Sequence, residues 1–258
     1  MSLAFQSFGD GLPIVLLHGL FGSGDNLRIL ARGLESRYRV LLPDLPNHGN
    51  SPHINSSTHE AMVEAVEDFI HDQSLVNPIL AGHSVGGKLA MMISLRHPER
   101  VPALISIDIA PRRFQASHLE IIAAMRELPL DSIRGRGDAD RALAEAVPDP
   151  AVRAFFLKNL VRDGERFRWR LNLDAVAADY DALLGWQSPG TTYDGPTLFV
   201  GGEHSRYLQA ERDTSAIHHL FPAARIHMIP DAGHWLHADK PDQLLAIMSR
   251  FLSGLDAS

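Results

Sequence analysis

The sequence predicts an α/β protein with a mostly parallel central sheet, flanking helices and a helical cap inserted between two strands. First, short apolar runs alternate along the chain with longer amphipathic stretches, as in parallel sheets whose strands are buried on both faces. Second, this alternation stops between Pro111 and about Gly195, where only helical patterns occur. Third, a glycine-flanked serine joins one apolar run to the amphipathic stretch that follows it.

Six continuous apolar runs have the length of buried strands. They cover residues 12–19, 38–44, 78–83, 103–110, 197–202 and 224–230. Residues 3–11, LAFQSFGDG, add a further strand that ends in an Asp-Gly turn. Helices are expected between these runs, over residues 26–36, 58–72, 86–99, 207–221 and 241–255.

The region without strand-like runs is expected to form the cap. We therefore place the core in residues 1–110 and 195–258 and the cap in residues 111–194, with helices over 118–128, 138–147 and 150–160. Five aromatic residues of this region are expected mainly to build the cap's own small core: Phe114, Phe155, Phe156, Trp169 and Trp186.

Composition excludes several classes of partner and chemistry. The chain has 258 residues, a formal net charge of -7 and no cysteine. A nucleic-acid partner is not expected because no basic stripe occurs, and thiolate chemistry is excluded. The first residues lack a secretory pattern, and no apolar run is long enough to span a membrane. We expect a cytoplasmic protein without a membrane partner.

The stretch LAGHSVGGKLA (80–90) places Ser84 two residues from Gly82 and from Gly86. Small residues at these positions allow a very tight strand-to-helix turn, which would raise the serine hydroxyl above the sheet edge. The helix N-terminus would favour negative charge developing beside it. Ser84 is therefore the predicted nucleophile, whereas Lys88 is expected to face solvent.

A serine hydroxyl needs a base to take its proton. His234, in DAGHWLHADKP, is the predicted base because it follows the last expected strand and precedes the C-terminal helix. Its position as the last of the three groups fits the order nucleophile, acid, base. His237 and His227 are weaker alternatives.

The acid that orients the base is predicted to be Asp108, at the end of the run 103–110. A buried carboxylate among isoleucines needs a partner such as an imidazole. The position after the run 197–202 where an aspartate often occurs holds Ser205, which cannot carry the charge. Glu203 is the second candidate for the acid, followed by Asp213 and Asp231.

The stretch LLHGLFGSGDN (16–26) is expected to bind the developing oxyanion. Leu20 is the first choice for one backbone N–H donor and Phe21 the second, while Val85 supplies the other donor. His18 and His48 are expected to brace loops, because their spacing does not form a metal site. No cofactor is expected.

Together these residues resemble the α/β-hydrolase superfamily, and most closely the bacterial esterases of the YbfF type, relatives of the ABHD-class hydrolases. The matching stretches are residues 18–27, 44–51, 82–88, 107–111, 156–173 and 232–235. The resemblance implies the α/β-hydrolase fold and an acid after the IDIAP strand, in agreement with Asp108. One departure is Asn47, where the superfamily usually has an arginine.

The resemblance implies hydrolysis of short- to medium-chain esters, with acyl-CoA thioesters as a further candidate. A small-molecule ester or thioester is thus the expected partner, through an acyl-enzyme on Ser84. Carbon–carbon bond hydrolysis, cofactor-free haloperoxidase activity and a non-catalytic sensor of small ligands remain alternatives. Oligomeric state cannot be deduced.

Overall fold

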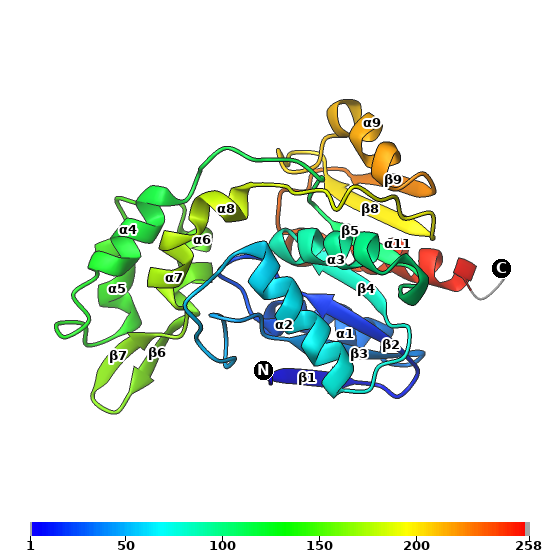
Figure 1. The fold of residues 1–258 in the computed structure, drawn as a ribbon. Coiled ribbons are helices and arrows are strands. Elements are labelled where there is room, and N and C mark those ends of the chain that lie inside the picture. Colours follow the sequence, from blue (N-terminus) through cyan, green and yellow to red (C-terminus); the bar gives the residue numbers. More distant parts are fainter. Residues whose placement is uncertain (1, 256–258) are drawn as a thin grey trace.

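Seven strands form one sheet in the order β1-β3-β2-β4-β5-β8-β9 (Figure 1). The structure is a computed structural model that describes residues 2–255. The strands are β1 (Phe5–Phe8), β2 (Leu12–Leu17), β3 (Tyr38–Pro43), β4 (Ile79–His83), β5 (Leu104–Ile107), β8 (Thr197–Gly202) and β9 (Ala224–Ile229). Only the pair β1 and β3 is antiparallel. This mostly parallel sheet confirms the predicted fold class.

Helices cover both faces of the sheet (Figure 1). One face carries α1 (Arg28–Leu34) and α11 (Pro241–Leu255), and the other carries α2 (His59–Asp72), α3 (Val85–Arg96) and α9 (Ala210–Leu220). Each layer shares a hydrophobic cluster with the strands beneath it. The short helices are η1 (Gly24–Leu27), η2 (Pro98–Arg100) and α10 (Leu236–Asp239). Among residues 2–255, no helix is both long and apolar enough to cross a bilayer.

Residues 111–194, which we call the inserted segment, connect the neighbouring strands β5 and β8. In Figure 1 this segment lies beyond the carboxyl ends of the strands. Its elements are α4 (Leu119–Glu127), α5 (Arg136–Leu143), α6 (Pro150–Leu157), β6 (Leu160–Asp163), β7 (Arg166–Trp169), α7 (Leu173–Ala178) and α8 (Tyr180–Leu184).

The hairpin β6–β7 corrects the expectation that the inserted segment contains helices alone. Partly buried Phe167 and Trp169 alternate with exposed Arg166 and Arg168, which is the period-two pattern of a strand. Gly164, with φ of 62°, closes the turn. The arginines conceal this pattern in a search for continuous apolar runs.

Candidate active site

Ser84 and Asp108 each follow the end of a strand, and the two strands are parallel neighbours. His83 pairs with Ile107 at the end of this register. The Ser84 N–H donates to the Ile107 carbonyl at 3.0 Å, and the Asp108 N–H donates to the Val200 carbonyl at 2.7 Å. Both side chains therefore start from the same edge of the sheet.

The turn at Ser84 is as tight as the sequence predicts. Ser84 has φ of 53° and ψ of -122°, a backbone conformation that is strained for a residue with a side chain. A Cβ on Gly82 would lie 2.2 Å from the Gly86 carbonyl oxygen, and one on Gly86 would lie 2.4 Å from the Leu17 carbonyl oxygen. Glycine at both flanking positions is thus a steric requirement of the turn.

Asp108 and His234 form a direct hydrogen bond. The Nδ1–H of His234 donates to Oδ2 of Asp108 at 2.6 Å, and Asp108 is fully buried. The Gly202 N–H donates to Oδ1 at 3.0 Å, and the Ser205 hydroxyl donates to Oδ2. Burial raises the pKa of Asp108 to about 7, and the hydrogen bonds from Ser205 and Gly202 oppose this increase.

Burial, together with the nearby charge of Arg206, lowers the pKa of His234 to about 3. The ring is therefore neutral at pH 7. Because Nδ1 carries the hydrogen that Asp108 accepts, Nε2 is left as the acceptor. Nε2 of His234 can therefore accept a proton.

Two residues that the sequence did not single out hold His234 in place. The Nε2–H of buried His83 donates to the His234 carbonyl at 2.8 Å. The Tyr207 ring lies against the His234 imidazole with 4.1 Å between ring centroids. The loop and the ring orientation of His234 are therefore both supported.

The structure does not bring the alternative acids to His234. The carboxylate of exposed Glu203 accepts the N–H of Asp231, and buried Asp213 pairs with arginines. His227 is exposed on β9. His237 is buried at the site, where its ring lies 4.8 Å from the His83 ring, centroid to centroid.

The loop after β2 makes a turn closed by the Gly22 N–H, which donates to the Gly19 carbonyl at 3.0 Å. Phe21 has φ of 63° in this turn. His18 braces the loop, because its Nε2 accepts the Leu45 N–H at 2.9 Å and its Nδ1–H donates to the Gly19 carbonyl at 2.8 Å. Burial lowers the pKa of His18 to about 4, so the brace is neutral.

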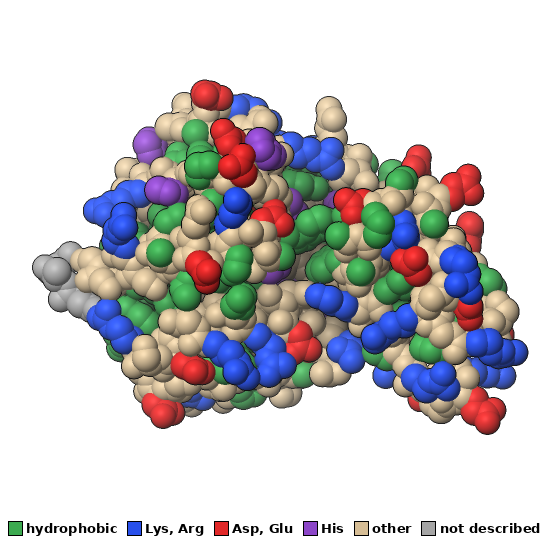
Figure 2. Space-filling model, turned by 180° about the vertical axis from the view of Figure 1, so that it is seen from behind, with side chains coloured by type: hydrophobic (Ala, Val, Ile, Leu, Met, Phe, Trp, Pro, Cys, Tyr) green, Lys and Arg blue, Asp and Glu red, His purple; other side chains and the backbone are tan. Residues whose placement is uncertain are grey.

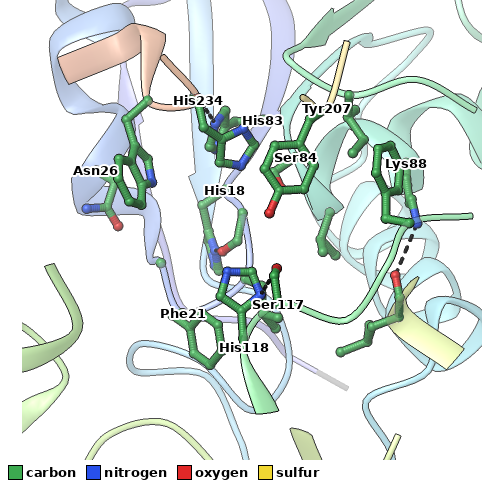
Figure 3. Close-up of a pocket in the computed structure, with 18 of the residues that line it drawn as sticks. His18, Phe21, Asn26, His83, Ser84, Lys88, Ser117, His118, Tyr207 and His234 are labelled. Atoms are coloured by element: carbon green, nitrogen blue, oxygen red, sulfur yellow. Dashed lines mark hydrogen bonds between the residues drawn. The ribbon is translucent and has the colours of Figure 1, made fainter. Parts of the chain in front are cut away.

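Ser84, His234, Leu20 and Val85 line one pocket between the sheet edge and the inserted segment (Figure 3). Figure 2 shows a hollow between these two parts of the molecule, with hydrophobic and histidine side chains along its walls. Three aromatic residues expected to build the cap's core also line the pocket: Phe114, Phe155 and Phe156. Most of the exposed surface of the pocket is apolar, but several histidines also line it: His18, His83, His118, His234 and His237.

Lys88 corrects the expectation of a solvent-facing side chain, since it is only 2% exposed. Its Nζ donates to the carbonyls of Leu183 at 3.1 Å, Leu184 at 3.2 Å and Gly185 (Figure 3). These carbonyls lie at the end of helix α8, so Lys88 joins helix α3, which begins directly after Ser84, to the inserted segment. Almost every residue of α3 is buried, which leaves no solvent-facing side at this position.

Two asparagines make further links to the inserted segment. The buried Asn159 donates from Nδ2 to the carbonyl of Phe21 at 2.8 Å. Asn47, the departure from the superfamily pattern, accepts at Oδ1 from Asn172 at 3.0 Å and from the Ile54 N–H at 2.7 Å. In this chain, Asn47 therefore joins its own loop to the loop of Ile54 and to Asn172 of the inserted segment.

The strand order, the strained serine turn and the Asp108–His234 pair define an α/β hydrolase. Residues 14–247 match the alpha/beta hydrolase family model, and the chain belongs to this family. It is 42% identical to the mouse sn-1-specific diacylglycerol lipase ABHD11, over 95% of this chain and 83% of that protein. It is 36% identical to esterase YbfF of Escherichia coli K12, over 96% of both chains. This similarity confirms the resemblance found in the sequence.

The solved structure of a marine microorganism esterase superimposes with a TM-score of 0.92 at 35% identity. The match covers 96% of this chain and 98% of that one. The overall fold is thus shared almost throughout.

Proposed function

We propose that the protein is a serine hydrolase of carboxylic esters that works through an acyl-enzyme on Ser84. The observation that carries this proposal is the buried Asp108–His234 hydrogen bond beside the strained turn of Ser84. Relatives named as an esterase and as diacylglycerol lipases support the substrate class.

In the first step, the Ser84 hydroxyl oxygen attacks the ester carbonyl while Nε2 of His234 takes the hydroxyl proton. The N–H groups of Leu20 and Val85 stabilise the oxyanion. The imidazolium then protonates the departing alcohol. Water repeats the sequence on the acyl-enzyme, and Asp108 orients His234 throughout.

Residues 111–194 act in this proposal as a cap that shapes the acyl pocket over a core of residues 1–110 and 195–258. Two hydrogen bonds attach the cap to the core in this proposal: Lys88 of the core donates to the Leu183 carbonyl, and Asn159 of the cap donates to the Phe21 carbonyl.

Thioesters of coenzyme A are a second candidate substrate class. A hollow beside the pocket shares four lining residues with it. Four arginines line this hollow: Arg112, Arg113, Arg206 and Arg212. Arg112 and Arg212 pair with Asp213, and Arg113 pairs with Asp181. The remaining excess of arginine in this lining favours an anionic leaving group near the pocket.

A fluorophosphonate probe and a p-nitrophenyl butyrate assay test the proposal. Wild-type protein is expected to label at Ser84 and release p-nitrophenol in a burst, whereas Ser84→Ala loses both. Normal turnover by Ser84→Ala would refute the assignment. Labelling without turnover would favour a small-ligand sensor, and turnover of C–C substrates alone would favour that other class of hydrolase.

A further inference from the structure

His118 is a polar residue of the pocket that the proposed chemistry does not use. It precedes α4 in the inserted segment and lines the same pocket as Ser84. Figure 3 shows His118 and Ser117 across the pocket from His234, with Ser84 between them. A substrate attached to Ser84 would therefore lie against this ring.

The contacts of Tyr180 fix the tautomer of His118. The Tyr180 hydroxyl oxygen accepts the N–H of His118 at 3.0 Å and the N–H of Ser117 at 3.3 Å. With its lone pairs so occupied, the hydroxyl donates its own hydrogen to Nδ1 of His118, 2.9 Å away. Nδ1 is therefore an acceptor, and the neutral ring carries its hydrogen on Nε2.

The Nε2–H has no hydrogen-bond partner within residues 2–255, and in Figure 3 it points into the pocket. The ring is held from the other side by Phe21, with 5.5 Å between ring centroids. Burial, with smaller contributions from neighbouring His234 and Arg206, lowers the pKa of His118 to about 4, so the ring stays neutral at pH 7.

We propose that His118 is a specificity residue whose Nε2–H donates to an oxygen of the substrate outside the reacting carbonyl. The preferred substrates are then esters that carry a second oxygen, as a hydroxyl, an ether or a carbonyl. A hydrocarbon group beside His118 would leave the Nε2–H without a hydrogen-bond acceptor. The oxygenated ester is therefore expected to have a kcat/KM about tenfold higher than that of its hydrocarbon counterpart. This inference rests on the proposed function.

Two pairs of esters of matched shape test the inference. The acyl arm compares p-nitrophenyl 3-methoxypropanoate with p-nitrophenyl pentanoate, and the alcohol arm compares glycerol 1-monobutyrate with 2-methylbutyl butyrate, in which methyl groups replace the two hydroxyls. In wild-type protein the oxygenated ester is favoured in one arm, which locates the bound oxygen. His118→Phe should bring the kcat/KM ratio of the two esters in that arm close to one. His118→Gln keeps an N–H donor and should retain more of the preference. The control His219→Phe, on the exposed side of α9, should leave the ratio unchanged.

Nitrogen-15 NMR of labelled histidines gives a readout independent of turnover. The expected signal for His118 has the hydrogen on Nε2, and a hydrogen on Nδ1 overturns the inference. Equal ratios in wild-type and His118→Phe protein, in both arms, also overturn it while leaving the esterase proposal intact. Failure of wild-type protein to hydrolyse any of the four esters overturns the proposed function itself.

Discussion

Ser205 donates its hydroxyl hydrogen to Oδ2 of Asp108, the same carboxylate oxygen that accepts the hydrogen of His234. The serine thus occupies the position where an aspartate was sought in the sequence, and from the end of β8 it donates to the carboxylate that follows the neighbouring strand β5. The carboxylate of Asp108 and the hydroxyl of Ser205 that donates to it therefore come from the ends of two different strands, β5 and β8.

Ser205→Ala should lower kcat/KM by about 10- to 100-fold, since a hydrogen bond to a charged group is worth about 1.5–3 kcal/mol. The Ser205 hydrogen bond lowers the pKa of Asp108. Its loss therefore raises the proton affinity of the Asp108–His234 pair, and the acid limb of the pH–rate profile moves to higher pH. An acid limb that stays in place, or moves down, contradicts this role. Ser132→Ala, in the inserted segment, is the matched control.

Asp108→Asn should reduce kcat by about 10³- to 10⁴-fold, because an amide cannot hold the imidazole in the required tautomer or stabilise its charged form. Glu203→Gln should change kcat by no more than about twofold, because that carboxylate is exposed and accepts only the Asp231 N–H. Steady-state kinetics on p-nitrophenyl butyrate compare the two variants. The opposite ranking would transfer the acid role to Glu203.

Asn159→Asp should slow fluorophosphonate labelling of Ser84 and lower kcat by about tenfold. The isosteric carboxylate has no hydrogen to donate to the Phe21 carbonyl, so the loop that carries Leu20 loses its support. KM should change less than kcat, because the loss concerns the transition state. A rise in KM with unchanged kcat would instead assign Asn159 to substrate binding.

Lys88→Met should destabilise the fold by about 1–3 kcal/mol, since three carbonyls at the end of α8 lose their buried donor. Burial lowers the pKa of Lys88 from 10.5 to about 7. Between these pH values the unfolded chain holds the proton that the folded chain has released, so wild-type stability rises with pH relative to the variant.

Melting temperatures at pH 6 and pH 9 check this prediction. The difference between wild type and Lys88→Met should widen at the higher pH, whereas Lys158→Met, which changes an exposed lysine, should show no such trend. A constant difference would mean that Lys88 keeps its proton across this range.

The sheet could be predicted because buried parallel strands are continuous apolar runs, and β8 spans the predicted residues 197–202. The run 103–110 gives a shorter strand, Leu104–Ile107, because Asp108 with φ of 52° turns the chain away. That Ser84, Asp108 and His234 lie close together could be predicted because each follows a strand at the carboxyl edge.

Contacts between distant parts of the chain could not be predicted. The burial of Lys88 depends on the carbonyls at the end of α8, about a hundred residues later. The bond from Ser205 to Asp108 joins two different strand ends. No local sequence pattern predicts such pairs, because the groups that bind the lysine or the serine lie far away in the sequence.

The inserted segment departs and re-enters between adjacent strands, so its replacement by the corresponding segment of a relative would leave the sheet order unchanged. A transplanted segment would nevertheless have to present three helix-end carbonyls to Lys88 and an amide to Phe21. Chimeras that keep these two attachment points should retain a working pocket, and those that lose them should not.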